Sequence, residues 1–114
     1  MLRDFKVLLD DILEASQRIR SYTDGLSLPE LRADQKTIDA VVRNLEVMGE
    51  AIKKLPAEVR DRHPDVPWKK IAGLRDILIH QYFGIDLDIV WDVVETKLPA
   101  LAERVAEILA AESD

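Results

Sequence analysis

Residues 34–55 of the chain read DQKTIDAVVRNLEVMGEAIKKL, and this stretch decides the fold. Its apolar residues recur at intervals of three and four, which is the spacing of one stripe along an amphipathic α-helix. Asp34 is a residue type preferred at a helix N-cap, and Pro56 follows the stretch and stops the helix. The stretch therefore predicts a long helix with an apolar stripe, whose members are Ile38, Val41, Val42, Leu45, Met48, Ile52 and Leu55.

The sequence on the N-terminal side has the same character. Residues 2–22 carry apolar side chains at helical spacing, and Gly25 is the expected C′ residue that ends this helix. Ser27 and Glu30 have the spacing of a capping box, which predicts a short turn of helix before Asp34.

The sequence on the C-terminal side predicts further helices. A short helix through Arg60 is expected after Pro56, and a connector at residues 63–67 (HPDVP) then leads into a third long helix. That helix is expected to run from Trp68 to about Tyr82.

The last helical region is expected to begin at a cap formed by Asp86 or Asp88. Pro99 lies inside it and predicts a kink, or two abutting helices, near Lys97. No segment shows the alternation of a β-strand. The chain is therefore expected to be all-α, an up-and-down helical bundle of four to five helices in a single domain over residues 1–114.

Composition excludes several classes of protein. The chain has 114 residues, 47% of them hydrophobic and 33% charged, which is typical of a globular domain and not of a disordered chain. Cysteine is absent, which excludes disulfides, thiolate zinc sites and a cysteine nucleophile. Neither a membrane helix of roughly 20 apolar residues nor a signal peptide is apparent, so we expect a cytoplasmic protein.

The charge of the chain is unevenly distributed. The net charge is −6, which argues against a protein that binds duplex DNA. Residues 53–75, however, hold seven basic and three acidic side chains and carry +4, which leaves −10 for the rest. This segment is either a set of ordinary solvated helix faces or a local site for phosphate.

Known phosphate and metal motifs are absent from the sequence. The four glycines form no phosphate-binding loop, and neither histidine completes a Glu-x-x-His motif. Two histidines without cysteine make no specific metal constellation, so no metal and no cofactor is expected.

Unusual polar chemistry is concentrated in residues 73–82 (GLRDILIHQY). Asp76 and His80 are four residues apart and can meet on one helix face, where the carboxylate would raise the pKa of the imidazole. Arg75 and Tyr82 share another face, and Arg75 is separated from His80 by about 140° on an ideal helix. The two could face one spot only if the helix end unwinds or a second subunit contributes.

Each of these residues also has a purely structural interpretation. His80 can be a helix-terminal histidine paired with Asp76, Arg75 a surface ion pair with Asp76 or Glu95, and Tyr82 a core aromatic. Arginine with histidine is nevertheless the pair that metal-free RNA cleavage requires. Arginine neutralises charge on the phosphate, and histidine transfers the protons near neutral pH.

The pattern Arg75-x4-His80-x-Tyr82 resembles the R-x4-H-x-Y motif of the HepT-like toxins, a branch of the HEPN domains. The flanking sequence agrees with the resemblance over nearly the whole chain, at residues 42–51 (VRNLEVMGEA), 63–75 (HPDVPWKKIAGLR), 80–86 (HQYFGID) and 90–91 (VW). One position departs from the family pattern, because Asp76 stands where relatives often have Asn. Its carboxylate repels RNA phosphate but supports a protonated His80.

The resemblance implies a helical-bundle homodimer whose two motifs line a shared cleft, acting as a metal-independent ribonuclease toxin on RNA. It implies that Arg75 and His80 are catalytic, with Asp76 as the polar residue beside the arginine. It also implies a partner, a small MntA-like nucleotidyltransferase antitoxin, which uses ATP to add AMP to Tyr82 and silences the toxin.

Two other interpretations remain open on the sequence alone. The acidic remainder of the chain suits a basic protein partner, which favours a non-catalytic dimeric subunit or substrate of the nucleotidyltransferase. A purely structural helical adaptor is the third hypothesis. Trp68 and Trp91 are expected to be core or interface anchors, and His63 is expected to be a turn residue.

Overall fold

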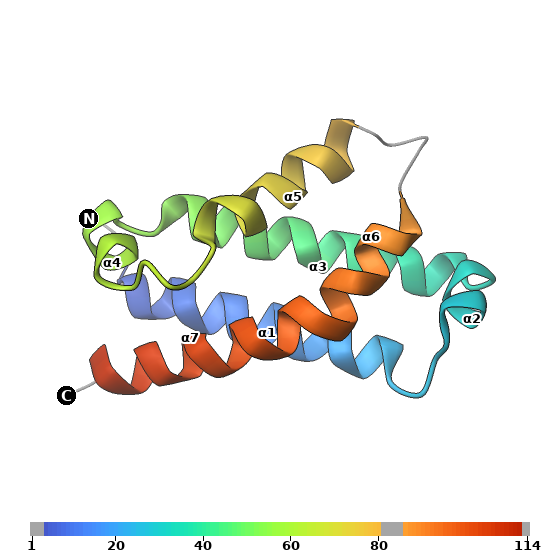
Figure 1. The fold of residues 1–114 in the computed structure, drawn as a ribbon, viewed down its shortest axis with the longest axis horizontal. Helices are drawn as coiled ribbons and strands as arrows, with labels where there is room; N and C mark the ends of the chain where they lie inside the picture. The colour runs from blue at the N-terminus through green and yellow to red at the C-terminus, as the bar shows by residue number, and fades with distance from the viewer. Residues whose placement is uncertain (1–3, 81–85, 113–114) are drawn as a thin grey trace.

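The computed structural model describes residues 4–80 and 86–112, and for residues 75–80 it describes the helical backbone. The described residues contain no strand, which confirms the all-α prediction (Figure 1). The elements in chain order are α1 (Phe5–Thr23), α2 (Leu28–Arg32), α3 (Gln35–Lys54), α4 (Ala57–Arg62), α5 (Trp68–His80), α6 (Leu87–Asp92), the π-helical segment η2 (Val93–Lys97) and α7 (Leu98–Glu112).

The helix ends follow the local signals in the sequence. Gly25 has φ of +77° just after α1, a conformation that glycine adopts without steric cost. Ser27 and Glu30 form the predicted capping box at α2. At the start of α3, a carboxylate oxygen of Asp34 accepts a hydrogen bond from the amide of Thr37 at 3.1 Å.

One expected helix boundary differs from the structure, and another lies outside the described residues. The helix expected to reach Arg60 extends to Arg62, because nothing in its last turn breaks the helix before His63. The expected end of the third long helix at Tyr82 lies outside the described residues, and α5 is described as far as His80.

The predicted irregularity near Lys97 is confirmed, and it takes the form of a π-helical segment. Pro99 has no N–H to donate to the carbonyl of Glu95, and its ring crowds that carbonyl. A π-helical turn widens the helix at such a point, and η2 accordingly covers Val93–Lys97, directly before α7. The chain thus passes from α6 through η2 into α7 as one irregular helix (Figure 1).

The long helices pack in up-and-down order. In Figure 1, α1 and α3 run side by side in opposite directions, α5 crosses α3, and α6 to α7 return along α1. Towards its C-terminal end, α5 leans away from the other helices (Figure 1). The apolar stripes meet in one core, whose fully buried large side chains include Leu9, Ile12, Ile19, Val41, Met48, Ile52, Leu98, Val105 and Ile108.

Among the described residues, no helix combines the length and the apolar character that a membrane span requires.

Candidate active site

The helix that carries the sequence motif is anchored at its beginning. Trp68, the first residue of α5, is 5% exposed, and its indole Nε1 donates a hydrogen bond to the carbonyl oxygen of His63 at 3.0 Å. Ile71, one turn later, is buried in the same core. Because these contacts hold the first turn against the bundle, they set the direction in which α5 runs towards the motif. Trp68 is therefore a core anchor, as the sequence predicted.

The structure places three motif residues on one helix. Arg75, Asp76 and His80 all belong to α5, which is helical through His80. Helical geometry puts positions 76 and 80 on one face and separates positions 75 and 80 by about 140°. The side chains of these three residues lie outside the description, so their mutual contacts stay a prediction.

The fourth motif residue, Tyr82, lies outside the described residues. It follows the last residue of α5 by two positions in the sequence. Its assignment as a modification site stays a prediction.

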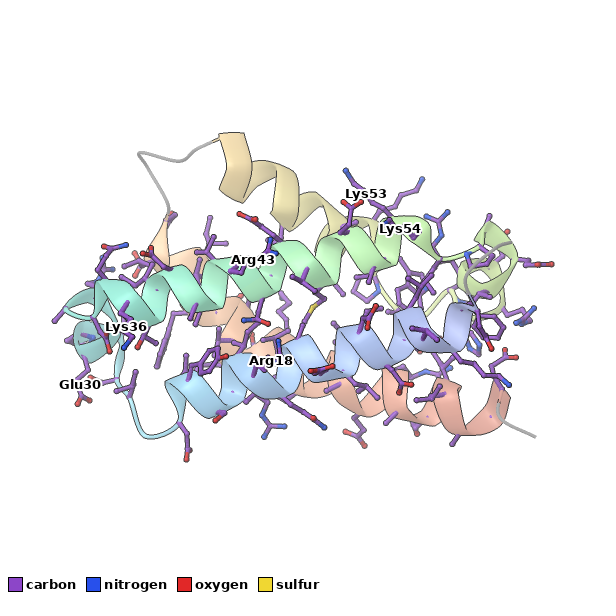
Figure 2. All side chains as sticks on the ribbon, turned by 180° about the vertical axis from the view of Figure 1, so that it is seen from behind. Arg18, Glu30, Lys36, Arg43, Lys53 and Lys54 are labelled. Carbon is purple, nitrogen blue, oxygen red and sulfur yellow. The ribbon has the colours of Figure 1, made fainter. Side chains whose placement is uncertain are left out.

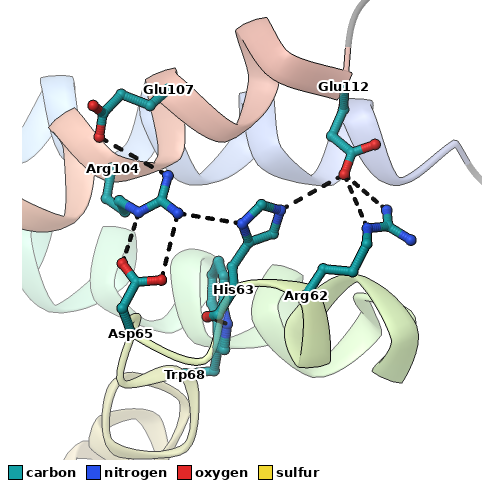
Figure 3. Close-up of polar contacts among 7 residues, drawn as sticks. All are labelled: Arg62, His63, Asp65, Trp68, Arg104, Glu107 and Glu112. Carbon is teal, nitrogen blue, oxygen red and sulfur yellow. Dashed lines mark hydrogen bonds and ion pairs between the residues drawn. The ribbon is translucent and has the colours of Figure 1, made fainter.

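A polar network joins the connector before α5 to α7 (Figure 3). The guanidinium of Arg104 donates from Nε to the Asp65 carboxylate at 2.7 Å, and its second nitrogen lies 3.3 Å from Nδ1 of His63. On the other side of the imidazole, Nε2 lies 3.6 Å from the carboxylate of Glu112. Arg62 donates to that carboxylate at 2.8 Å. The network thereby ties the segment that precedes α5 to two turns of α7.

The geometry of the network indicates the tautomer of His63. A guanidinium can only donate hydrogen bonds, so Nδ1 of His63 must accept where it meets Arg104. The ring proton of the neutral imidazole is then on Nε2, which points towards Glu112. His63 therefore has more partners than the turn residue that the sequence predicted, while it also ends α4 as its C-cap.

Two carboxylates of the network have lowered pKa values. The hydrogen bond from Arg104 holds the pKa of Asp65 below its ordinary value of 3.8. The hydrogen bond from Arg62 holds the pKa of Glu112 below its ordinary value of 4.5. Asp65 is exposed and Glu112 is partly exposed, so water screens these interactions.

These pKa shifts predict how Arg104 contributes to stability at different pH. A carboxylate whose pKa is lowered by folding stabilises the native state above its unfolded pKa, and the contribution is lost as pH falls through the lowered value. We expect Arg104→Gln to have a lower free energy of unfolding than wild type above about pH 4, with the difference shrinking towards pH 2. Urea denaturation from pH 2 to 7 measures it.

A matched control for this prediction is Arg20→Gln, which removes an exposed arginine from the last turn of α1. The difference between this control and wild type should stay constant from pH 2 to 7. A difference between Arg104→Gln and wild type that stays constant from pH 2 to 7 would contradict the assigned role of the Asp65 carboxylate.

No local pattern in the sequence predicts this network. Asp65 and Arg104 are 39 residues apart, and His63 and Arg104 are 41 apart. Such pairs follow from how α7 packs, which single-sequence periodicity does not specify. Among the residues whose side chains are described, no group of three His, Cys, Asp or Glu residues is arranged to hold a metal ion.

Comparison with known proteins adds to these observations. The family model described as "Ribonuclease HepT-like" matches residues 12–108. The matched range includes α5 and most of the bundle. No solved structure matches the chain.

Several curated relatives align along most of the chain. A Methanocaldococcus jannaschii protein named "Putative RNase MJ0127" is 45% identical over 94% of this chain and 88% of its own length. A Caldanaerobacter subterraneus protein named "Putative RNase TTE0752" is 42% identical over 91% of this chain and 93% of its own. The "Probable ribonuclease HepT" of Thermococcus cleftensis is 41% identical over 89% of this chain and 92% of its own. The chain belongs to the HepT-like ribonuclease family.

Proposed function

We propose that the chain is a metal-independent endoribonuclease, the toxin of a toxin–antitoxin pair. The observation that carries the proposal is the presence of Arg75 and His80 on one helix of a chain that belongs to the HepT-like family. The names of its relatives support an RNA substrate, since they describe those proteins as ribonucleases.

RNA supplies the nucleophile in the proposed reaction. The 2′-oxygen of a ribose attacks the adjacent phosphorus, and the bond from phosphorus to the 5′-oxygen of the next nucleotide breaks. His80 takes the proton of the 2′-hydroxyl or gives a proton to the leaving 5′-oxygen. Arg75 neutralises the charge that develops on the non-bridging oxygens. The products are a 2′,3′-cyclic phosphate and a 5′-hydroxyl.

Asp76 is proposed to tune His80. Asp76 and His80 are four positions apart on the helical part of α5, so the carboxylate can stabilise the protonated imidazole. The same negative charge disfavours phosphate nearby, so Asp76 acts on the histidine and not on the substrate.

We propose a homodimer because one helix cannot direct positions 75 and 80 towards the same point. Two copies of α5 facing each other would let Arg75 of one protomer act beside His80 of the other. An apolar hollow of about 340 Å³, lined by Val66, Pro67, Ile71 and Leu101 among others, supports such an interface. Ile89, which lines a neighbouring hollow, is 46% exposed.

The proposed partner is an MntA-like nucleotidyltransferase antitoxin, and the proposed location is the cytoplasm, where RNA and ATP are available. The phenol oxygen of Tyr82 attacks the α-phosphorus of ATP, pyrophosphate leaves, and the phenol proton is lost to a base. The AMP phosphate then occupies the neighbourhood of Arg75 and excludes RNA phosphate by like-charge repulsion.

Tyr82→Phe is expected to abolish AMP transfer, because phenylalanine has no oxygen to attack ATP. RNA cleavage by Tyr82→Phe should remain within a few fold of wild type. Mass spectrometry after incubation with the antitoxin and ATP measures the modification, with Tyr22→Phe as the control because Tyr22 lies in α1. Full AMP transfer to Tyr82→Phe, or its loss in Tyr22→Phe, would contradict the assignment.

A non-catalytic subunit of the nucleotidyltransferase is the second candidate, and the −10 charge outside residues 53–75 favours it. Incubation of unmodified protein with total RNA and chelator separates the two. Cleavage supports the ribonuclease, whereas AMP transfer without any cleavage supports the subunit.

A further inference from the structure

Three basic side chains near the start of α5 remain without a role in the proposed reaction. Within residues 53–75, Lys54 lies 3.8 Å from Glu50, and Arg62 pairs with Glu112. By contrast, no ion pair or side-chain hydrogen bond joins Arg60, Lys69 or Lys70 to another of the described residues. Basic groups without internal partners are available to an anionic ligand.

Two of these cations line the same hollow. A shallow hollow of about 430 Å³ lies between α4 and the start of α5, and both Arg60 and Lys69 line it. Asp61 also lines it, so the two cations outnumber the carboxylate. The Nε of Arg60 is buried and has no partner within the described part of the chain. The lining of the hollow therefore carries a net positive charge, and Nε of Arg60 is a hydrogen-bond donor without a described partner.

The register of α5 connects this surface to the motif. Positions 69, 73, 76 and 80 are four, three and four residues apart, so they follow one face of the helix. Position 80 lies about 16 Å from position 69 along the helix axis. At Gly73, between them, an added Cβ would meet no described atom within 4 Å, so no described neighbour covers the helix at this position.

The chemistry of the surface favours phosphate over base recognition. Lysine binds phosphate as a point charge, without the stacking that reads or holds a base. The aromatic residue lining the hollow, Trp68, is 5% exposed and offers little face for a base.

We propose that Arg60 and Lys69 bind the phosphate backbone of single-stranded RNA and position it along the face of α5 that leads from Lys69 to His80. This assignment rests on the proposed ribonuclease function, and it makes these two side chains positioning residues. Phosphate contacts fix the register of the strand and carry no sequence preference.

Lys69→Gln is the direct test, with Lys36→Gln as the matched control. Both lysines are exposed, but Lys36 lies in the first turn of α3, at the end remote from Lys53 and Lys54 (Figure 2). Loss of one phosphate contact lowers the slope of log affinity against log salt by about 0.7 for a single strand, which is about fivefold in affinity at 0.1 M salt. We expect Lys69→Gln to raise KM about fivefold with kcat unchanged, and Lys69→Arg to restore KM.

Binding of a single-stranded RNA oligonucleotide at several salt concentrations, in a His80→Ala background, separates this proposal from the ribonuclease function. A reduced salt slope in Lys69→Gln, with no cleavage by wild type, would support the surface and contradict the enzyme. Cleavage by wild type with equal KM and slope for Lys69→Gln and Lys36→Gln would overturn the surface and leave the enzyme. If Lys69→Gln bound the nucleotidyltransferase more weakly but bound RNA as wild type does, the proposed RNA surface would also be overturned.

Discussion

Replacing His80 by alanine is expected to lower the rate of RNA cleavage by about 10²–10⁴-fold, because the substitution removes the group that transfers protons in the reaction. Arg75→Ala is expected to lower it by about 10²–10³-fold, because the charge on the phosphate is no longer neutralised. Both effects should appear in kcat. The contacts that bind the RNA backbone away from the reacting phosphate do not involve either side chain, so KM should change little.

The matched control is His63→Ala, which changes the other of the two histidines in the chain. His63 joins the connector before α5 to α7 through Arg104 and Glu112, so its loss should lower stability and leave kcat within a few fold. Circular dichroism establishes that each variant is folded. Cleavage at the wild-type rate by folded His80→Ala would contradict the catalytic assignment, as would equal losses in both histidine variants.

Trp68→Ala is expected to destabilise the protein by about 3–5 kcal/mol, the range for truncating a large buried aromatic side chain. The indole is 5% exposed and donates a hydrogen bond to the carbonyl oxygen of His63, so its removal leaves a cavity and takes away one hydrogen bond. The carbonyl keeps the hydrogen bond that it accepts from the amide of Val66 at 3.2 Å. Urea denaturation followed by circular dichroism measures the change in the free energy of unfolding. Such a loss is a large part of the roughly 5–15 kcal/mol that stabilises a typical domain.

Trp68→Phe serves as the control for this variant. It keeps most of the apolar volume and loses the indole hydrogen bond, so a smaller destabilisation of about 1 kcal/mol is expected from the bond. If Trp68→Ala lost less than 1 kcal/mol, the start of α5 would not be anchored by this side chain.

The helices could be predicted from the sequence because their causes are local. The apolar stripe of residues 34–55 became α3, and the caps at Ser27 and Asp34 form with neighbours three residues away. Gly25 marks the end of α1 because glycine adopts positive φ without steric cost. The irregularity before Pro99 follows from a missing amide and a crowded carbonyl four residues upstream.

The contacts between distant segments could not be predicted in the same way. Arg104 meets Asp65 and His63 only because α7 packs beside the connector, and periodicity does not specify which polar residues then face each other. The candidate site has a comparable limit, since Arg75 and His80 are about 140° apart on one helix. In the proposed homodimer their joint action depends on how a second chain is arranged, and local spacing in one sequence does not encode that arrangement.

In the proposed reaction RNA provides its own nucleophile and no metal takes part. The most direct measurement is incubation of the unmodified protein with single strands of RNA and DNA of the same sequence, in excess chelator, followed by analysis of the product ends. We expect RNA to be cleaved to 2′,3′-cyclic phosphate and 5′-hydroxyl ends and DNA, which has no 2′-hydroxyl, to stay intact. Cleavage of DNA, or RNA cleavage that appears only when Mg²⁺ is restored, would contradict it.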